Sequence, residues 1–273
     1  MIFLKLGGSL ITDKTQPNTP RLNVLNRLAQ EIAQSLITNN QQPLLLGHGS
    51  GSFGHAAAKK YGTRQGVRDA AGWRGFAEVS VAAARLNRIV ADSLHEAGVL
   101  VISVLPSASV MCADGVIEHM DAQMIHTALA HGLAPLVMGD VALDSVRGGT
   151  IVSTEEVFGY LSQQLPVTRI LLAGETEGVY ERYSPGNPGP VIAKITPQNW
   201  AQISGGIGGS RGGRCDRRHG QQSARYGGTG AGQPQHQRAN IFGANCGQRG
   251  AGVGWRDAGH ADRGGVIILR LSA

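Results

Sequence analysis

A buried strand that runs straight into a glycine turn and a helix constrains this fold more than any other feature. Three consecutive leucines at 44–46 predict a short strand that is buried on both faces, as in a parallel sheet. Alternate glycines follow within 47–55, and a helix is expected to begin near Ser52. Unpaired N–H groups at such a helix start favour a phosphate ligand. An alternative interpretation is a tight strand–helix turn that binds no ligand.

Other predicted strands also end in glycine or acidic residues. A strand at 2–6 runs into the glycine turn 7–9, and later strands end at 139–140 and 174–175. Because ligands of parallel sheets gather at the carboxyl ends of the strands, these segments are expected at one edge. Two glycine turns suit two phosphate-bearing ligands that face each other. Neither turn fits the GxxxxGK[ST] phosphate loop or the dinucleotide fingerprint.

Strands and helices alternate along the first two thirds of the chain. The expected helices are 20–36, with Thr19 as N-cap and Pro20 in the first helical position, then 76–97, 122–130 and one capped by Ser153. The remaining expected strands are 99–105, 133–138 and 168–173, with hairpins at 110–118 and 141–152 that turn at Asp114-Gly115 and Arg147-Gly148-Gly149. This alternation predicts an α/β fold whose mostly parallel sheet is covered on both faces.

Composition excludes several classes of protein. The chain of 273 residues is long enough for one large α/β domain or two lobes. No signal peptide and no apolar run of about 20 residues is seen, so a soluble, cytoplasmic protein without a membrane partner is expected. The three cysteines, Cys112, Cys215 and Cys246, form neither a disulfide framework nor a zinc pattern, and no metal-ligand set is predicted. The net charge of +6 comes from arginines scattered after Ser210 without interleaved aromatics, which argues against nucleic acid as a partner.

Three segments in order resemble the amino acid kinase superfamily. They are Lys-Leu-Gly-Gly-Ser-Leu-Ile-Thr-Asp-Lys at 5–14, the turn 47–55 with Lys-Lys-Tyr at 59–61, and 139–141 with Asp-Ser-Val-Arg-Gly at 144–148. Within the superfamily, the Ser-Phe-Gly-His ending of the second turn is similar to the isopentenyl phosphate kinases. Acetylglutamate, aspartate and uridylate kinases lack this histidine. The resemblance covers residues 1 to about 210.

The resemblance implies a three-layer αβα sandwich of the amino acid kinase type. A single domain would span 1–273, with an acceptor-substrate lobe at 1–165 and a nucleotide lobe at 166–273. The implied reaction is phosphoryl transfer from ATP to isopentenyl phosphate in isoprenoid precursor synthesis (the mevalonate pathway), with Mg²⁺ and a homodimer. Two alternatives stay open: a related phosphate or phosphonate kinase similar to fosfomycin kinases, and an inactive remnant that binds only the acceptor.

The resemblance also implies the residues of the site. The implied ATP-binding residues are Lys5, Leu6, Gly7, Gly8, Ser9, Ser50, Gly174, Glu175 and Gly178. The implied acceptor-binding residues are Gly49, Gly51, Gly54, His55, Gly139, Asp140 and Gly149. The implied catalytic residues are Lys5, Lys14, His55 and Asp144. The lysines would stabilise the moving phosphoryl group, His55 would hold the acceptor phosphate, and Asp144 would orient the lysines or take part in Mg²⁺ binding.

Each of these assignments has a simpler alternative. Lys5 can be a solvated strand end, His55 can cap its helix, and Asp144 can be a hairpin residue. Trp73 and Phe76 fit either an isoprenoid pocket or core packing. At Glu175 and Glu177, many members of the superfamily carry aspartates, which weakens the nucleotide contact implied there.

Near Ser210 the pattern changes abruptly. Periodicity ends, Gly, Arg and Gln dominate up to Gly265, and no lysine follows Lys194. A flexible Gly/Arg-rich tail is one interpretation. The resemblance instead implies an Asp-Val-Thr-Gly-Gly-Met segment and a lysine that contacts ATP phosphates in this part of the chain.

A shifted reading frame recovers the missing segment. Plausible codons for 212–223, read from the second base, give Gly-Val-Asp-Val-Thr-Gly-Gly-Met-Ala-Ser-Lys. The same shift permits a helix-like and a strand-like segment through 225–249 and a final strand near 259–262. We therefore predict that residues from about Arg211 onward are translated one base out of frame. A chain with this tail lacks the third lysine, a helix and closing strands, so weak or absent kinase activity is expected.

Overall fold

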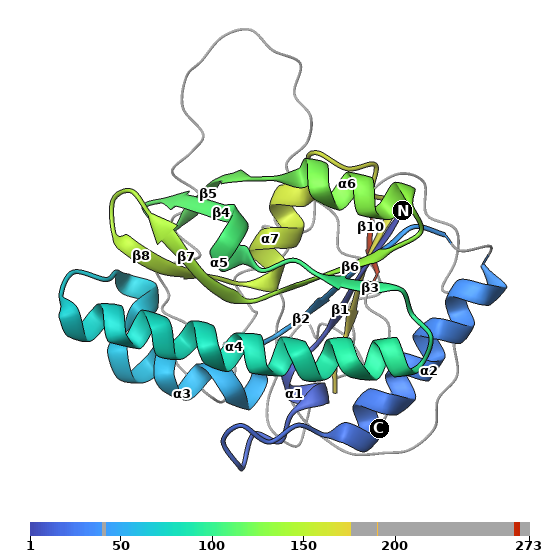
Figure 1. Cartoon of the computed structure of the whole chain (residues 1–273), viewed down its shortest axis with the longest axis horizontal. Coiled ribbons are helices and arrows are strands. Elements are labelled where there is room, and N and C mark those ends of the chain that lie inside the picture. Colours follow the sequence, from blue (N-terminus) through green and yellow to red (C-terminus); the bar gives the residue numbers. More distant parts are fainter. Residues whose placement is uncertain (40–41, 176–189, 191–264, 268–273) are drawn as a thin grey trace, which may run out of the picture.

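The computed structural model describes residues 1–39, 42–175, 190 and 265–267. Two sheets and the helices around them make up this part of the chain (Figure 1). Glu177, Gly178 and the tail from about Arg211 to residue 264, where a frame change is predicted, lie outside the described residues. Among the described helices, none has the length and apolar character that a bilayer crossing needs.

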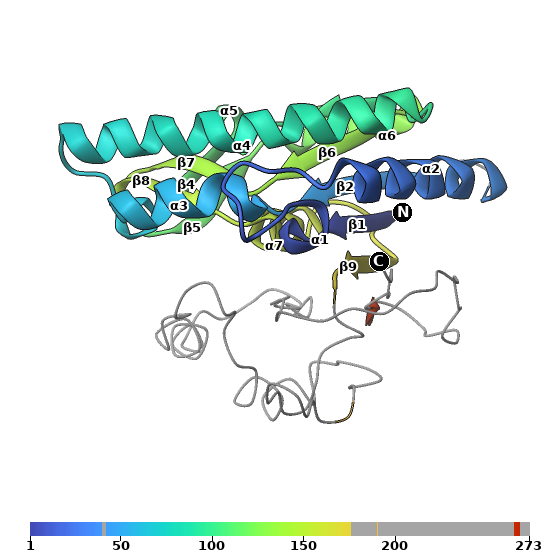
Figure 2. The same cartoon turned by 90° about the horizontal axis from the view of Figure 1, so that it is seen from below.

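The larger sheet is parallel throughout, as the alternation of strands and helices predicts. Its strands, in spatial order, are β10 (Gly265–Ile267), β9 (Arg169–Ala173), β1 (Ile2–Leu6), β2 (Leu44–His48), β6 (Ala134–Met138) and β3 (Val101–Ser103). The order can be followed from β10 to β6 in Figure 2. β1 therefore lies inside the sheet, between β2 and β9.

The register of β1 aligns the carboxyl ends of three strands. Leu6 pairs with His48 on one side and with Ala173 on the other. Beyond the strands, the N–H of Gly7 donates to the carbonyl of Ala173 at 2.8 Å. The N–H of Gly49 donates to the carbonyl of Leu6 at 3.0 Å. The glycine turn after β1, the glycine turn after β2 and the end of β9 are thus held together at the carboxyl edge of the larger sheet, as predicted.

Helices cover both faces of the larger sheet. On one face, α2 (Leu22–Thr38) and α4 (Ala70–Glu96) pack on alternate strand residues such as Leu4 and Leu46. On the other, α6 (Ala122–Ala130) and α7 (Thr154–Leu161) pack on Phe3 and its neighbours, and the rings of Phe3 and Phe158 lie 5.0 Å apart. Figure 1 shows these layers above and below the strands. The predicted three-layer α/β sandwich is confirmed.

The smaller sheet joins two hairpins. It contains β5 (Val116–Met120), β4 (Val110–Ala113), β7 (Asp140–Asp144) and β8 (Gly148–Val152) in that order. The first hairpin turns at Asp114 and Gly115, both with positive φ, as predicted. The second turns at 145–147, two residues before the predicted turn, because Gly148 at φ 76° already pairs with Asp144 in the ladder.

Three predicted boundaries were wrong. Thr19 does not cap the helix expected at 20–36, because Pro20 forms a bridge with Thr12 and α2 begins at Leu22. The strand expected at 99–105 is only β3, since α5 (Pro106–Ser109) begins at its proline. The helix expected from 76 begins at Ala70, where the carboxylate of Asp69 accepts a hydrogen bond from the N–H of Gly72 at 2.7 Å.

Candidate active site

The two glycine turns are in direct backbone contact. One leads from β1 into α1 (Gly8–Ile11), and the other leads from β2 into α3 (Gly51–Tyr61). A Cβ atom on Gly8 would lie 2.4 Å from the amide nitrogen of Gly51, and one on Gly49 would lie 2.9 Å from that of Gly8. No side chain fits in this contact. Glycine is therefore required because one turn approaches the other, and the sheet brings together the sites predicted for two phosphate ligands.

Thr12 links these turns, a role that the sequence did not suggest. Its side chain is fully buried. The hydroxyl donates to the carbonyl of Gly8 at 2.6 Å and accepts from the N–H of Ser52 at 2.9 Å. Thr12 lies inside the Lys-Leu-Gly-Gly-Ser-Leu-Ile-Thr-Asp-Lys segment that carries the family resemblance. Its hydrogen bond with Ser52 is a tertiary contact, which the sequence pattern does not predict.

Lys5 is not a solvated strand end. Its ammonium forms a close ion pair with the carboxylate of Glu155, in the first turn of α7. The two side chains are 15% and 18% exposed, so the pair lies largely out of water. Burial raises the pKa of Glu155, but the charge and the hydrogen bond of Lys5 outweigh it and hold this pKa below its usual value. Glu155 therefore stays charged at neutral pH.

Glu155 is oriented by the start of its helix. Ser153 caps α7 and forms the predicted capping box with Glu156: the serine hydroxyl accepts from the N–H of Glu156, whose carboxylate accepts from the N–H of Ser153. In the sequence, Glu155 was visible only as an acidic residue in a first helical turn. The fold gives it a second role beside Lys5.

Lys14 is carried on an exposed loop whose base is fixed. The loop runs from the end of α1 to α2, and the N–H of Asp13 donates to the carbonyl of Thr19 at 2.9 Å. The N–H of Asn18 donates to the carbonyl of Ser52 at 3.4 Å, which holds the loop against the start of α3. Lys5 and Lys14 thus flank α1 in the chain, and a Cβ atom on Gly49 would lie 3.8 Å from the Cε of Lys5.

His48 is a buried junction below the second turn. Asn87 of α4 donates to its Nε2 at 3.1 Å, so Nδ1 carries the proton and donates to the carbonyl of Gly49 at 3.1 Å. The carbonyl of His48 accepts from the hydroxyl of Thr154 at 2.6 Å and from the N–H of Gly139 at 3.3 Å. Burial lowers the pKa of His48 to about 4, so the imidazole is neutral at physiological pH.

Gly139 and Asp140 lie next to this junction. The Asp140 carboxylate is buried and accepts hydrogen bonds from the N–H groups of Ser107 at 3.1 Å and Val141 at 2.8 Å. Burial raises the pKa of Asp140, and these two residues partly oppose the rise. Its carboxylate oxygens hold the start of α5. Gly139 is joined through His48 to the turn 49–54, which is predicted to bind the acceptor and is called the acceptor turn below.

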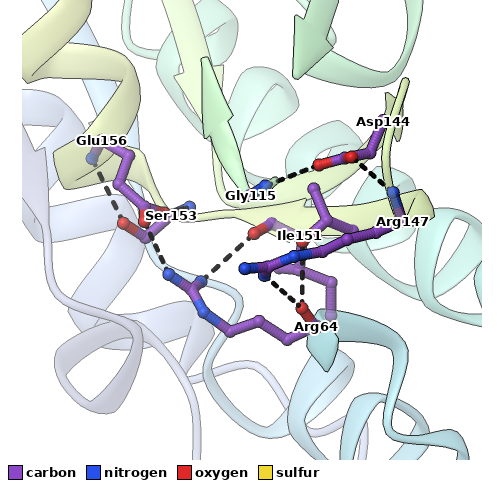
Figure 3. A network of polar contacts seen from close by, with 8 residues as sticks. Arg64, Gly115, Asp144, Arg147, Ile151, Ser153 and Glu156 are labelled. Carbon is purple, nitrogen blue, oxygen red and sulfur yellow. Dashed lines mark hydrogen bonds and ion pairs between the residues drawn. The ribbon is translucent and has the colours of Figure 1, made fainter. Parts of the chain in front are cut away.

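Asp144 lies at the tips of the two hairpins and accepts four backbone hydrogen bonds. Those from Gly115 and Arg147 are drawn in Figure 3. The donors are the N–H groups of Asp114, Gly115, Val146 and Arg147, at 2.7–3.1 Å. Burial raises the pKa of Asp144, but these donors outweigh it and the pKa lies below its usual value. Within the described part of the chain, Asp144 has no hydrogen bond or ion pair with Lys5 or Lys14. Its contacts are those of a hairpin residue, the alternative left open by the sequence.

Arg64 and Arg147 join the tips to the edge of the smaller sheet (Figure 3). Arg64 donates to the carbonyl of Ile151 at 3.2 Å and pairs with Glu156 at 2.6 Å. Arg147 donates to the carbonyl of Arg64 at 3.4 Å and pairs with Asp114 at 2.9 Å. These contacts cover the free edge of β8 and support the capping box of α7.

The end of β9 adds the third side of the site. A Cβ atom on Gly7 would lie 2.8 Å from the carbonyl oxygen of Ala173 and 3.6 Å from the Cα of Gly174. The carboxylate of Glu175 pairs with the guanidinium of Arg21 at the start of α2. The first glycine turn therefore lies between the acceptor turn and the segment predicted to border the nucleotide.

An apolar strip lies where the smaller sheet meets the start of α4. It consists of Met111, Leu143, Phe76 and Trp73. Met111 and Leu143 are paired on β4 and β7, Leu143 is paired with Gly149, and a Cβ on Gly149 would lie 2.8 Å from the ring of Phe76. The Phe76 ring packs edge-on against Trp73 at 5.4 Å. Met111, Leu143 and Trp73 remain 42–44% exposed, so the strip offers an apolar surface to a ligand.

The acidic residues of the site do not form a metal cage. No group of three or more His, Cys, Asp or Glu side chains that could hold a metal ion occurs in the described ranges. Glu155 is paired with Lys5, and Asp144 and Asp140 bind backbone N–H groups. The described residues therefore do not fit a magnesium ion held by protein ligands alone. Mg²⁺ is commonly bound through substrate phosphates in kinases, with few protein ligands.

Comparison with known proteins agrees with this geometry. The model of the amino acid kinase family matches residues 1–211. The chain belongs to the amino acid kinase family. Isopentenyl phosphate kinase from Methanocaldococcus jannaschii is 31% identical over 222 residues, which is 76% of this chain and 84% of that protein. The same-named protein from Methanothermobacter thermautotrophicus is 35% identical over 196 residues, 69% of this chain and 72% of that protein.

A solved structure of an isopentenyl phosphate kinase shares the fold as well. It is 32% identical, with a TM-score of 0.66 over 76% of this chain and 84% of that one. As a kinase of this family, the chain uses ATP as a substrate. The family match ends at residue 211, where the sequence predicts the change of reading frame. The tail beyond it lies outside the described residues apart from β10, so the frame change stays a prediction.

The structure brings many of the predicted residues together at the strand ends. Lys5, the turn 7–9, the turn 49–54 and Gly139 meet at the strand ends, directly or through His48. The backbone of His55 belongs to α3, and its side chain is outside the described part. Gly149 lies apart, on the smaller sheet under Phe76.

Proposed function

We propose that this kinase transfers the γ-phosphoryl group of ATP to the phosphate of isopentenyl phosphate, giving isopentenyl diphosphate and ADP. The backbone contact between Gly8 and Gly51 is the observation that carries the proposal. Two turns suited to phosphates lie side by side, which is what transfer between two phosphate-bearing substrates needs. The similarity to isopentenyl phosphate kinases supports this acceptor.

In this proposal the chain acts by positioning and by charge. The turn 7–9 would hold the ATP phosphates, and the turn 49–54 with His55 and Gly139 would hold the acceptor phosphate. Lys5, oriented by its ion pair with Glu155, and Lys14 would stabilise the phosphoryl group as it moves. Such a preorganised ammonium needs no rearrangement during the reaction, and no general base is required to attack with a phosphate oxygen that is already ionised.

The apolar strip supports a hydrocarbon tail on the acceptor. Trp73 and Leu143 expose apolar surface close to Gly149, the acceptor-site residue predicted on the smaller sheet. An isopentenyl group would bury part of this surface, whereas fosfomycin, a small polar phosphonate, would cover little of it. The strip therefore favours the isoprenoid acceptor.

Finer features belong to the same proposal. We assign the acceptor to residues 1–165 and the nucleotide to the remainder, including Gly174 and Glu175. Mg²⁺ would enter bound to the ATP phosphates and lower their charge. The working unit would be a homodimer, and the product would serve isoprenoid precursor synthesis by the mevalonate pathway.

ADP release with isopentenyl phosphate and with fosfomycin as acceptors tests the proposal. We expect weak turnover with isopentenyl phosphate and none with fosfomycin. Lys5→Ala should abolish this turnover, and Leu143→Asp should raise KM for isopentenyl phosphate. Calorimetry with isopentenyl phosphate, without ATP, shows whether the acceptor site works when turnover is weak. Preference for fosfomycin, or neither binding nor turnover of isopentenyl phosphate, would refute the assignment.

A further inference from the structure

One buried hydroxyl connects the segments assigned to the two substrates. The Thr12 side chain donates to the carbonyl of Gly8, in the turn after β1, and accepts from the N–H of Ser52, in the first turn of α3. The two distances, 2.6 and 2.9 Å, are those of well-formed hydrogen bonds, and the residue has no exposed surface. The hydroxyl thus donates its proton to α1 and accepts a hydrogen bond from α3, so that one side chain joins the two helix starts.

Ser52 depends on this hydroxyl. The first N–H groups of a helix have no intrahelical acceptor, and Ser52 is the second residue of α3. Thr12 supplies the acceptor that the helix lacks. The approach is so close that a Cβ on Gly51 would lie 2.1 Å from the Thr12 hydroxyl oxygen.

The same point fixes the loop that carries Lys14. Thr12 and Pro20 form a bridge at the base of this loop. On the far side of the loop, the N–H of Thr19 donates to the hydroxyl of Ser52 at 3.4 Å. Thr12 and Ser52 therefore hold both ends of the loop to the start of α3.

We propose that Thr12 is a positioning residue whose hydroxyl fixes the ATP turn, the acceptor turn and the Lys14 loop relative to one another. The role rests on the proposed function, because it places the two phosphates in line for transfer. Reacting atoms must come within about 3–3.5 Å, and a misplacement of about 1 Å can cost about 100-fold in rate. Thr12 acts through Gly8 and Ser52 and does not itself touch a substrate.

The first test needs no ligand. Thr12→Val keeps the shape of the side chain and removes the hydroxyl, whereas Thr12→Ser keeps the hydroxyl. Amide hydrogen exchange of Ser52, followed by NMR, is expected to be at least about 10-fold faster in T12V than in the original chain, and little changed in T12S. Equal exchange in T12V and the original chain would overturn the proposed link.

The second test measures catalysis. In T12V, kcat is expected to fall at least about 10-fold, while KM for ATP and for isopentenyl phosphate changes less than about 3-fold. T12S is expected to recover most of kcat. Thr63→Val is the matched control, because Thr63 is buried and its hydroxyl has no hydrogen-bond partner among the described residues.

The outcomes separate this role from simple stability and from the proposed function. A lower melting temperature of T12V with unchanged kcat per folded molecule would reduce Thr12 to a structural residue and overturn the proposal. An original chain that neither binds nor converts isopentenyl phosphate would overturn the proposed function and the catalytic role of Thr12 together. In that case, the amide hydrogen exchange rate of Ser52 would still show whether Thr12 and Ser52 form the hydrogen bond.

Discussion

The ammonium of Lys5 contacts the carboxylate of Glu155, although 150 positions separate them in the chain. Lys5 is near the end of β1, and Glu155 is in the first turn of α7. The contact places a charged, largely buried lysine beside the glycine turns, where phosphoryl transfer needs positive charge. It also gives the lysine a single orientation.

Glu155→Gln tests this orientation. The variant keeps the shape of the side chain but leaves the ammonium of Lys5 without its counter-charge, so we expect kcat to fall about 10- to 100-fold. Glu156→Gln is the control: it loses the ion pair with Arg64 and weakens the cap, which should cost about 1 kcal/mol of unfolding free energy. Steady-state ADP release and urea unfolding measure the two effects. If both variants lose kcat equally, Glu155 has no special relation to Lys5.

Asp144→Asn tests whether Asp144 stabilises the hairpin tips rather than orienting the lysines. Replacing the carboxylate that accepts four backbone hydrogen bonds should lower the free energy of unfolding by about 2 kcal/mol in urea at pH 7. Because the pKa of Asp144 is below its usual value, its contribution is present above the unfolded pKa of 3.8 and is lost as the pH falls through the folded pKa. A large loss of kcat with unchanged stability would instead support the lysine-orienting role.

The buried imidazole of His48 also makes the free energy of unfolding depend on pH. Here the destabilising form is the protonated, charged one, whereas for Asp144 it is the protonated, neutral one. Burial lowers the pKa of this imidazole from 6.5 to about 4. Between these values the unfolded chain binds the proton and the folded chain does not, so the unfolding free energy falls as the pH drops from 6.5 toward 4, by about 3 kcal/mol in total. Urea unfolding at several pH values should show this slope, and His48→Asn should flatten it. An equal slope in the variant would contradict the assignment.

The nucleotide sequence across codons 205–265 decides the nature of the tail. We expect the second-base frame to encode the Thr-Gly-Gly-Met and lysine segment. Restoring that frame should raise kcat about 100-fold or more, since loss of one group that stabilises transition-state charge typically costs this much. A gene that cannot encode the segment, or turnover of the present chain equal to that of intact relatives, would refute the frame change.

Local patterns predicted the strands, the glycine turns and the cap of α7 because short-range chemistry decides them. Three leucines make a buried strand, and Ser153 with Glu156 makes a capping box wherever the helix lies. The bridge between Thr12 and Pro20 shows the limit, since a tertiary contact overrode the cap expected at Thr19.

The residues that connect the site were hidden for the same reason. Glu155, His48 and Thr12 derive their roles from partners on other elements, and neither propensity nor spacing reports such contacts. The resemblance assigned chemistry to Asp144, while the fold shows a carboxylate bound by four turn amides. Side-chain surroundings of this kind follow from the three-dimensional packing.

The position of β1 inside the larger sheet has a consequence for synthesis on the ribosome. β1 emerges first, yet its neighbour β9 begins only at Arg169. At about 5–20 residues per second, the nascent β1 waits roughly 10–30 s for that neighbour. During this interval one of its edges is open to chaperones and to other chains. A frame change near residue 211 would come after this exposed phase, so the ribosome would deliver the altered tail to a chain whose first nine strands are already made.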